Sequence, residues 1–461
     1  MRRNSRIHCL DTVYYITLFV IGIWFFFFLG RNGYVLEKDS YSFIEGKQAV
    51  LSFGYILYPM ISSICRSIFG ELYIEVLFIL QSILALLTSF AVAEYIRRVY
   101  GLTRKMGLLV FVLSFGPYTY SLPQYVANHG ILTEGIAFPL FNLWMICAIE
   151  IYRDKQKIWY IVMFILSILL AMTRPQLLVF CVIFVILLID TYYRKHNISA
   201  KKTITWKEVL IIMFSVMILL VVGMFAFCGI VKKSYFPQLT DAVSGRVLCT
   251  IQENDEKLFT GEMKILYETI YDAVDENGDR DVYFRKDYKR WEDICVSTNN
   301  NTKLMGKIIS ENRELIDETY HEFANNEIKG ELVYPLLISH WDSYMAMTWE
   351  LFVQSLVVAI FVHPDGAYLF GCSVAVVLYV VSILLFFVLK KRNMWEYILP
   401  MRIVMIVITV LCGLTNVVFM GIQRYVVYPF GWFYIAVVVM LYRFIPNIRT
   451  IIDERKRNNN G

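Results

Sequence analysis

Two acidic side chains directly after the first apolar segment of the chain are candidates for proton transfer. Glu37 and Asp39 follow the apolar run 13–30, and the charge of Lys38 between them favours ionisation of both carboxyl groups. An ionised carboxylate can act as a general base toward a hydroxyl group within hydrogen-bonding distance. An acidic residue in an exposed loop is more commonly just solvated, so both interpretations stay open.

Two arginines at turns between apolar segments are candidates for binding an anion. Arg174 stands directly before Pro175, between two such segments, and Arg424 stands at the turn before the last one. A guanidinium at the end of a membrane helix suits a lipid phosphate, because it offers a planar fork of N–H donors and keeps its charge. The alternative for each arginine is an anchor to lipid headgroups. An ionisable residue at membrane depth is a functional hypothesis by default.

The elements that must position these residues are membrane helices. The chain has 461 residues, of which 57% are hydrophobic and 18% charged, whereas a soluble chain is about a quarter charged. This composition excludes a water-soluble enzyme, a disordered chain and a fibrous protein. It predicts an all-α polytopic membrane protein with about ten transmembrane helices, since a helix needs about 20 apolar residues to cross a bilayer. The apolar runs lie at 13–30, 72–96, 106–121, 131–151, 158–173, 175–193, 208–231, 366–389, 398–420 and 425–442.

The distribution of charge predicts the orientation. The net charge of +5 conceals six basic segments that together carry 23 Lys and Arg against 5 Asp and Glu. The short connections that alternate with them, 122–130, 174 and 421–424, carry only Arg174 and Arg424. Because cytoplasmic loops are enriched in Lys and Arg, we expect both termini and all six basic segments to be cytoplasmic. The basic segments are 1–12, 97–105, 152–157, 194–207, 389–397 and the tail from 443.

Three regions follow from this topology. Residues 1–231 form an N-terminal module of seven spans with a first outer loop at 31–70, and residues 366–461 form a C-terminal module of three spans with a basic tail. Residues 232–365 form a large extracytoplasmic loop region. Its polar part, 232–348, holds 14 basic and 22 acidic residues and is expected to be mostly helical. The apolar stretch 349–362 is too short to span, so we expect a re-entrant or interfacial helix.

Several familiar kinds of site are missing from the sequence. There is no P-loop, no dinucleotide-binding glycine motif and no GxSxG, so a sugar or phosphate donor would not be a nucleotide. His321-Glu322 begins like a zinc-protease motif, but Asn325 stands where the second histidine is needed. The acidic run from Asp275 lacks the glycine and the closing glutamate of a calcium loop. The sequence therefore predicts no certain cofactor and no metal ligand set, although a divalent metal at a phosphate stays open.

The order of the outer motifs resembles the GT-C class of integral-membrane glycosyltransferases that use polyprenyl-phosphate sugars, such as the bacterial relatives of the protein O-mannosyltransferases. The likeness rests on an acidic motif after the first span, and it covers residues 1–231 and the last two spans. Its remaining motifs are Gly54-Tyr-Ile-Leu-Tyr-Pro59, Thr133-Glu134-Gly135, Thr173-Arg174-Pro175 and Arg424-Tyr-Val-Val-Tyr-Pro429. Unlike many members, this chain separates its two acidic residues by Lys38 and has no C-terminal soluble domain.

The resemblance implies a membrane enzyme that transfers a sugar with inversion at the anomeric carbon. Asp39, or Glu37 in its place, would take the proton from the acceptor, and Arg174 and Arg424 would stabilise the leaving polyprenyl phosphate. The substrate cavity would be lined by His129, Glu134, Tyr55 and Tyr58. For His129 and Glu134, a helix cap or a structural hydrogen bond is an equally good interpretation. For Tyr55 and Tyr58, packing is the better one.

The expected partners follow from this chemistry. They are a polyprenyl-phosphate sugar donor, a glycan, lipid or protein acceptor, and membrane lipids, with no nucleic acid. The expected location is a bacterial plasma membrane. Two other functions stay open: a polysaccharide polymerase or ligase, in which His321 and His340 would matter and Asp39 would not, and a lipid-linked glycan flippase or transporter.

Overall fold

The computed structural model describes residues 2–29, 33–44, 57–122, 124–153, 156–198, 243–276, 290–312, 324–361, 368–418 and 423–459. Within these ranges the chain is helical, and its one β-bridge pairs Val35 with Gly130 in parallel. The chain divides into two compact units. Unit 1 comprises 1–233, 359–411 and 427–461, and unit 2 comprises 234–358 and 412–426.

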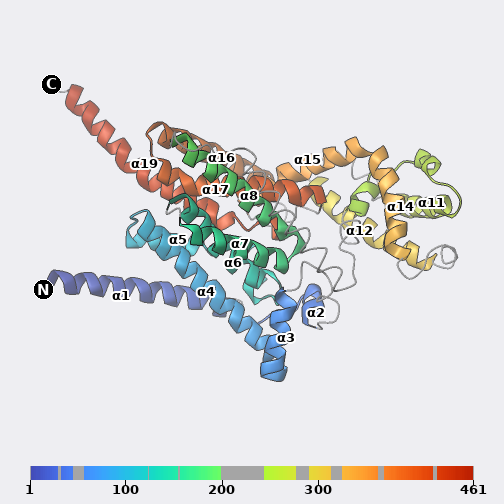
Figure 1. Cartoon of the computed structure of the whole chain (residues 1–461), viewed down its shortest axis with the longest axis horizontal. Coiled ribbons are helices and arrows are strands. Elements are labelled where there is room, and N and C mark those ends of the chain that lie inside the picture. The colour runs from blue at the N-terminus through green and yellow to red at the C-terminus, as the bar shows by residue number, and fades with distance from the viewer. Residues whose placement is uncertain are drawn as a thin grey trace. The chain divides into compact units, whose positions relative to one another are not determined.

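Unit 1 is a bundle of long apolar helices (Figure 1). Its α-helices are α1 (Arg2–Ile23), α2 (Lys38–Ile44), α3 (Leu57–Phe69), α4 (Tyr73–Val99), α5 (Arg104–Leu113), α6 (Glu134–Arg153), α7 (Lys157–Thr173), α8 (Val179–Ile198), α16 (Tyr368–Lys391), α19 (Phe430–Asn459) and most of α17 (Trp395–Val418). A π-helical turn, Trp24–Phe28, extends α1. Short 3₁₀ turns lie at Gly70–Leu72, Gly116–Thr119, Ala127–His129 and Pro175–Leu178.

Five helical segments of the described chain are long and apolar enough to cross a membrane. They are Leu10–Phe28, Leu57–Val99, Glu134–Arg153, Phe370–Lys391 and Trp395–Val417. Three shorter apolar helices, Ile158–Thr173, Gln176–Thr191 and Phe430–Pro446, coincide with further predicted spans. The helical, multi-pass character is therefore confirmed in its coarse form, whereas the number ten is not shown. The predicted span 208–231 lies outside the described residues.

The predicted span over 106–121 is not one continuous α-helix. Helix α5 ends at Leu113, and the chain continues through the 3₁₀ turn Gly116–Thr119. The ten residues of α5 rise only about 15 Å, half the thickness of the hydrocarbon core. Pro117 has no backbone N–H and restricts the residue before it, so an α-helix does not continue through this point.

The turn after α5 is also a close contact with α19. A Cβ atom at Gly431 would clash with the carbonyl oxygen of Leu113 and would lie 3.3 Å from Cδ of Pro117. We expect Gly431→Ala to lower the free energy of unfolding by about 1–3 kcal/mol, because backbone atoms at such a contact cannot move aside cheaply. The matched control is Gly413→Ala in helix α17, where the nearest atom lies 3.9 Å away. That substitution should be neutral or stabilising, and equal losses from both variants would contradict the prediction.

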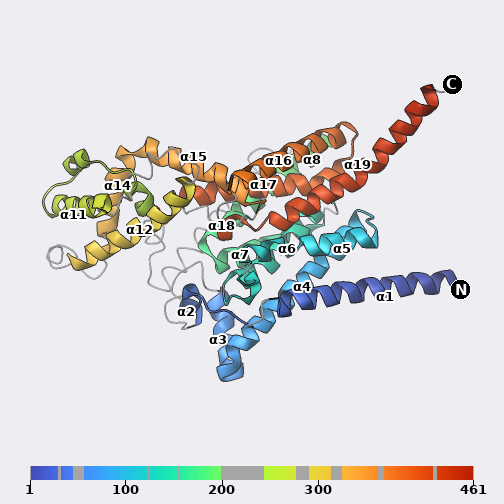
Figure 2. The same ribbon diagram turned by 180° about the vertical axis from the view of Figure 1, so that it is seen from behind.

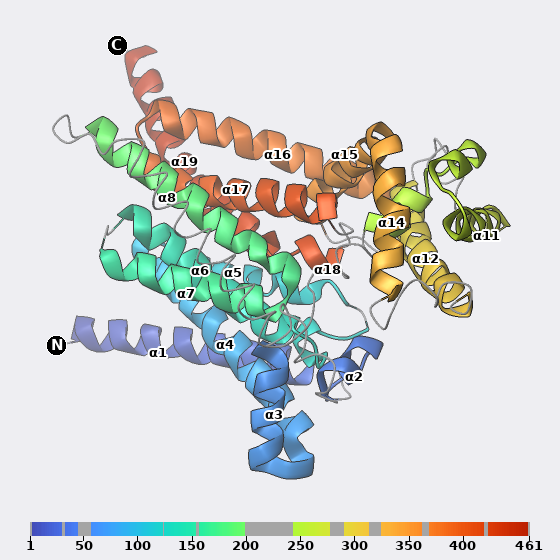
Figure 3. The ribbon, with the colours of Figure 1, turned by 45° about the vertical axis from the view of Figure 1, so that its right-hand side comes forward.

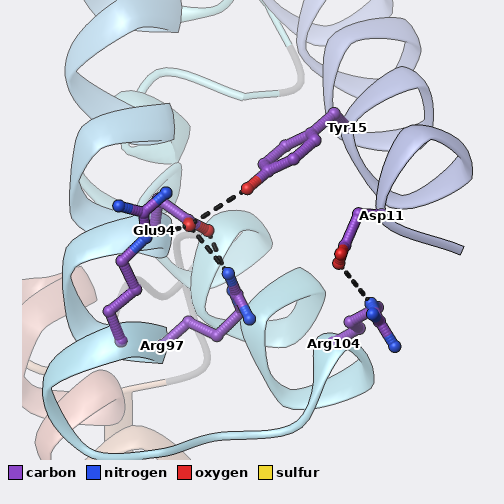
Figure 4. Close-up of polar contacts among 6 residues, drawn as sticks. Asp11, Tyr15, Glu94, Arg97 and Arg104 are labelled. Carbon is purple, nitrogen blue, oxygen red and sulfur yellow. Dashed lines mark hydrogen bonds and ion pairs between the residues drawn. The ribbon is translucent and has the colours of Figure 1, made fainter. Parts of the chain in front are cut away.

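Contacts between charged side chains gather the predicted cytoplasmic segments at one end of unit 1. In Figure 4, Glu94 of α4 accepts hydrogen bonds from Tyr15 of α1 (3.1 Å) and from Nη2 of Arg97 (2.7 Å). Asp11 of α1 lies 2.7 Å from Nε of Arg104 at the start of α5. These pairs join the N-terminal segment to the turn between α4 and α5.

Other basic connections reach the same end of unit 1. Tyr442 of α19 donates a hydrogen bond to the carbonyl of Gly101 (3.3 Å). The guanidinium of Arg443 lies over the ring of Tyr397, near the start of α17 (5.2 Å). Both described ends of the chain also lie at one end of this unit in Figures 1 and 2. The arrangement agrees with a common side for the basic segments, and the choice of the cytoplasmic side stays a prediction.

Unit 2 is a separate helical body with its own apolar core. Its helices are α11 (Glu262–Glu276), α12 (Arg290–Glu311), α14 (Ala324–Ser339), α15 (Trp341–Val358) and α18 (Gln423–Val426), with the 3₁₀ turn Glu253–Leu258 and the end of α17. Helix α12 packs against α11, α14 and α15 (Figure 3). The core includes Leu266, Ile270, Met305, Leu332 and Tyr344. The predicted loop region is thus helical where it is described, and α15 overlaps the predicted interfacial stretch 349–362.

Candidate functional site

The candidate site lies at the end of unit 1 opposite the charged cluster, around the segment that precedes α6. This segment, residues 124–133, is almost wholly buried although it has little regular structure. Buried irregular backbone needs hydrogen-bond partners for its polar groups. Gln81 of α4 supplies two of them, because its Nε2 donates to the carbonyl oxygens of Asn128 (3.1 Å) and Gly130 (3.2 Å).

Tyr58 completes the contacts of Gln81. The phenol of Tyr58, in α3, donates to Oε1 of Gln81 at 2.7 Å, and both side chains are fully buried. A Cβ atom at residue 135 would collide with Oε1 of Gln81, so Gly135 leaves the room that this amide occupies. Tyr58, which was predicted to line a substrate cavity, thus holds the side chain of Gln81 in this structure, and a role toward a substrate stays a prediction. Tyr55 lies outside the described residues.

The carbonyl of Phe26 ties the same segment to the first membrane helix. The chain around Phe26 is a π-helical turn, a form that often marks functional positions because it redirects backbone groups. The Phe26 oxygen accepts hydrogen bonds from Nδ2 of Asn128 (3.1 Å) and from Nε2 of His129 (3.0 Å). Because a carbonyl can only accept, the Nε2 atom of His129 carries a proton. In the neutral imidazole the Nδ1 atom is then an acceptor.

Two buried acceptors of this segment have no hydrogen-bond partner among the described residues. They are Nδ1 of His129 and Oδ1 of Asn128, and both side chains are fully buried. Buried polar atoms in native proteins are nearly always paired with protein or ordered water. A water molecule or a hydroxyl group that donates a hydrogen bond to these atoms would satisfy them. The predicted role of His129 beside a substrate stays a prediction.

The burial of His129 makes the stability of the protein depend on pH. Burial lowers the pKa of His129 below its ordinary value, since the charged imidazolium loses its water, and the hydrogen bond to Phe26 offsets this only in part. The unfolded chain therefore binds this proton at a higher pH than the folded chain does. The contribution of His129 to the free energy of unfolding is therefore complete above about pH 6.5, the pKa of histidine in the unfolded chain. It is lost as the pH falls below that value.

We accordingly expect the thermal midpoint of the purified protein to fall between pH 7.5 and pH 5. His129→Gln should make that fall smaller, because glutamine keeps a donor for the Phe26 carbonyl and does not titrate. The measurement is thermal unfolding of both proteins in detergent across this pH range. An unchanged slope in the variant would contradict the assignment to His129.

Glu134 and Arg174 form a buried ion pair beside this segment. Oε1 of Glu134, at the first residue of α6, lies 2.9 Å from Nη2 of Arg174, and the exposed fractions of the two side chains are 0% and 4%. Thr133 joins them, since its hydroxyl donates to Glu134 (3.1 Å) and accepts from Nε of Arg174 (2.5 Å). A carboxylate at a helix N-terminus is also favoured by the helix dipole. The structure thus brings together two residues that the sequence separates by 40 positions.

The backbone of Val35 holds the acidic motif near the same loop. Val35 N–H donates to the carbonyl of His129 (2.9 Å), and its own carbonyl accepts from Ile131 N–H (3.0 Å). Leu36 and Ile44, on either side of Asp39, pack against the apolar cluster that contains Tyr58 and Ile131. Asp39 lies in the first turn of α2 and is exposed. Glu37 is half-buried, and its N–H donates to the hydroxyl of Ser40 (2.9 Å).

The predicted site residues therefore fall into three groups. Asp39 is exposed and Glu37 half-buried in the acidic motif, whereas Tyr58, His129, Glu134 and Arg174 are buried with partners inside unit 1. Arg424 is half-buried in α18 and belongs to unit 2. The structure brings the unit 1 residues into one region.

Gln81, Asn128 and Thr133 are the members of this region that sequence reasoning did not single out as site residues. Gln81 did carry a signal, because it is an amide inside the long apolar run 72–96. A polar side chain there needs a partner in the protein. Asn128 lies in the connection before the run 131–151 and Thr133 at the start of that run, where such residues are ordinary.

Within the described ranges, no group of three or more His, Cys, Asp or Glu residues is placed to hold a metal ion. A search of protein-family models, curated proteins and solved structures finds no match to this chain. The function is therefore argued from the site.

Proposed function

We propose that this protein is a membrane glycosyltransferase that moves a sugar from a polyprenyl-phosphate donor to an acceptor at the outer membrane surface. The observation that carries the proposal is the pairing of Val35 with His129 and Ile131, which holds the segment of Asp39 beside the buried Arg174 region. An exposed carboxylate and a buried guanidinium at one end of a membrane helix bundle are the two groups that this reaction requires.

The proposed reaction uses each group once. Asp39 removes the proton from an acceptor hydroxyl, and the resulting oxygen attacks the anomeric carbon of the sugar. The bond from that carbon to the phosphate oxygen breaks, the configuration inverts, and polyprenyl phosphate leaves with the negative charge. Arg174 stabilises that charge. Stabilisation of this kind acts most strongly where water is excluded, as it is around Arg174.

Glu134 has a positioning role in this proposal. It neutralises Arg174 in the absence of an anion and fixes the direction of the guanidinium through the contact at 2.9 Å. The guanidinium of Arg174 would then already be oriented when the donor phosphate binds. The phosphate would compete with Glu134 for the N–H groups of Arg174.

The test uses purified protein in lipid nanodiscs with a panel of sugar donors and an excess of acceptor hydroxyl compounds. We expect transfer from at least one polyprenyl-phosphate sugar and none from the corresponding nucleotide sugars. Mass spectrometry of the product, with the anomeric configuration by NMR, should show inversion. Transport of intact lipid-linked glycan into vesicles without sugar transfer would refute the proposal and favour a flippase.

One observation favours the second candidate, a polysaccharide polymerase or ligase. In unit 2, Nε2 of His340 lies 2.6 Å from Oδ2 of Asp255, and both side chains are about nine-tenths buried. Asp255 also accepts from the backbone N–H of Gln252 (2.7 Å), so the carboxylate is fixed in direction. A carboxylate that orients a histidine is an arrangement suited to proton transfer. His340→Gln should abolish a polymerase or ligase reaction and leave the transfer by Asp39 unchanged.

A further inference from the structure

A cleft of ≈ 690 Å³ lies between α8, α16 and α17 of unit 1, away from the candidate site. Its walls include Ile186 of α8, Ile383 and Phe386 of α16, and Met405 and Val410 of α17. The volume is that of a small-molecule site, about 300–1,000 Å³. Helices α16 and α17 are both long and apolar enough to cross a membrane. If both cross it, the cleft between them faces lipid chains and not water.

One wall of the cleft changes from apolar to cationic along a single helix face. Phe386 and Phe387 line the cleft, and Lys390 and Lys391 follow each of them by four residues. Residues four apart lie on the same face of a helix, so both ammonium groups extend that wall by one turn. Both lysines are exposed, and Nζ of Lys390 lies 5.6 Å from the ring centroid of Trp395.

The charge at this end of the cleft is mostly positive. Residues 390–402 contain Lys390, Lys391, Arg392 and Arg402 against the single acidic residue Glu396. Arg402 lines the cleft and is paired with Asp190 of α8, which also accepts a hydrogen bond from Tyr152 (2.6 Å). The cleft is therefore apolar at its centre, with a fixed ion pair in its wall and a basic rim.

A buried hydroxyl in the wall points independently to an occupant. Ser382 lines the cleft, only 2% of its surface is exposed, and its Oγ has no hydrogen-bond partner among the described residues. A serine inside an apolar helix normally bonds to a carbonyl of its own helix. An ester carbonyl of a lipid is an acceptor that such a hydroxyl can bind.

We propose that this cleft binds one anionic phospholipid, with an acyl chain between α16 and α17 and the headgroup phosphate at Lys390 and Lys391. Basic pockets between transmembrane helices recognise lipid headgroups by this combination. The site lies toward the end of unit 1 opposite Glu134 and Arg174, so it is separate from the proposed sugar transfer.

The test is native mass spectrometry of protein released into mild detergent from nanodiscs of equal phosphatidylglycerol and phosphatidylcholine. We expect one retained phospholipid per chain, mostly phosphatidylglycerol. Ile383→Trp fills the cleft and should reduce the retained lipid at least tenfold. The matched control is Val377→Trp on the same helix, where residue 377 is 59% exposed and does not line the cleft. Met405→Trp, from the opposite wall, replaces Ile383→Trp if that variant does not fold.

The headgroup is tested separately. The double variant Lys390→Gln/Lys391→Gln should still retain a lipid, while the ratio of phosphatidylglycerol to phosphatidylcholine falls about tenfold or more, since each cation near the surface attracts the anion independently. The proposal is overturned by wild-type protein without a bound lipid, by full retention in both cleft-filling variants, or by an unchanged headgroup ratio in the lysine variant.

Discussion

Asp39→Asn should lower the turnover number for sugar transfer by about 10² to 10⁴, because asparagine cannot accept the proton of the acceptor hydroxyl. The KM for the lipid donor should change little, since in this proposal Arg174 and not Asp39 holds the donor phosphate. Stability should change by no more than a few tenths of a kcal/mol. Asp39 is exposed, and the substitution removes its favourable charge in the first turn of α2.

Glu37→Gln is the matched control for this result. Glu37 is two residues away and half-buried, and the contact of its backbone N–H with Ser40 does not involve its carboxylate. We expect its turnover to stay within about fivefold of wild type, well short of the loss of a general base. A large loss in Glu37→Gln with normal turnover in Asp39→Asn would reassign the base to Glu37. Full activity in both variants would remove a general base from this segment altogether.

The buried pair of Glu134 and Arg174 should produce the largest change in stability. Breaking a buried ion pair from one side costs about 3–5 kcal/mol, because the other charge is left in a medium that solvates it poorly. We therefore expect Glu134→Gln and Arg174→Met each to lower the free energy of unfolding by this amount. The double variant should lose clearly less than the two single losses together, since no buried charge is left without its counterion.

The measurement is unfolding of all four proteins by SDS in mixed micelles, analysed as a double-mutant cycle. The pair suits the cycle because Nη2 of Arg174 and Oε1 of Glu134 are 2.9 Å apart and both side chains are almost wholly buried. Additive losses would mean that the two side chains stabilise the fold independently. Losses below about 1 kcal/mol would mean that water or lipid headgroups reach this pair.

Much of unit 1 follows from hydropathy alone. Predicted spans at 72–96, 131–151, 158–173 and 366–389 match α4, α6, α7 and α16 to within a few residues. This agreement has a physical reason: hydrogen bonds of a membrane helix close within the segment, so a local sum of side-chain hydrophobicity is sufficient to predict it. The interruption of the helix within 106–121 was not predicted for the same reason, since hydropathy does not register the break at Gly116-Pro117.

The candidate site followed from the sequence only as a list of residues. Arg174 and Glu134 were candidates because both lie at outer span ends, but nothing local to either predicts that each is the other's counterion. The same holds for Gln81, whose partners lie 23 residues before it and 47 and 49 after it. Such contacts depend on how helices pack, which apolar periodicity does not determine.

The sequence by itself determined that this is a helical membrane protein with its ionisable residues at the ends of apolar segments, because burial of charge is costly enough to leave a pattern in composition. Only the tertiary structure decided which of those residues meet. It neutralised Arg174 with Glu134, buried His129 with a hydrogen bond to the carbonyl of Phe26, and left Asp39 exposed. The reason is that an ion pair or a hydrogen bond needs two groups within about 3 Å, and distances between helices are set by packing and not by sequence position.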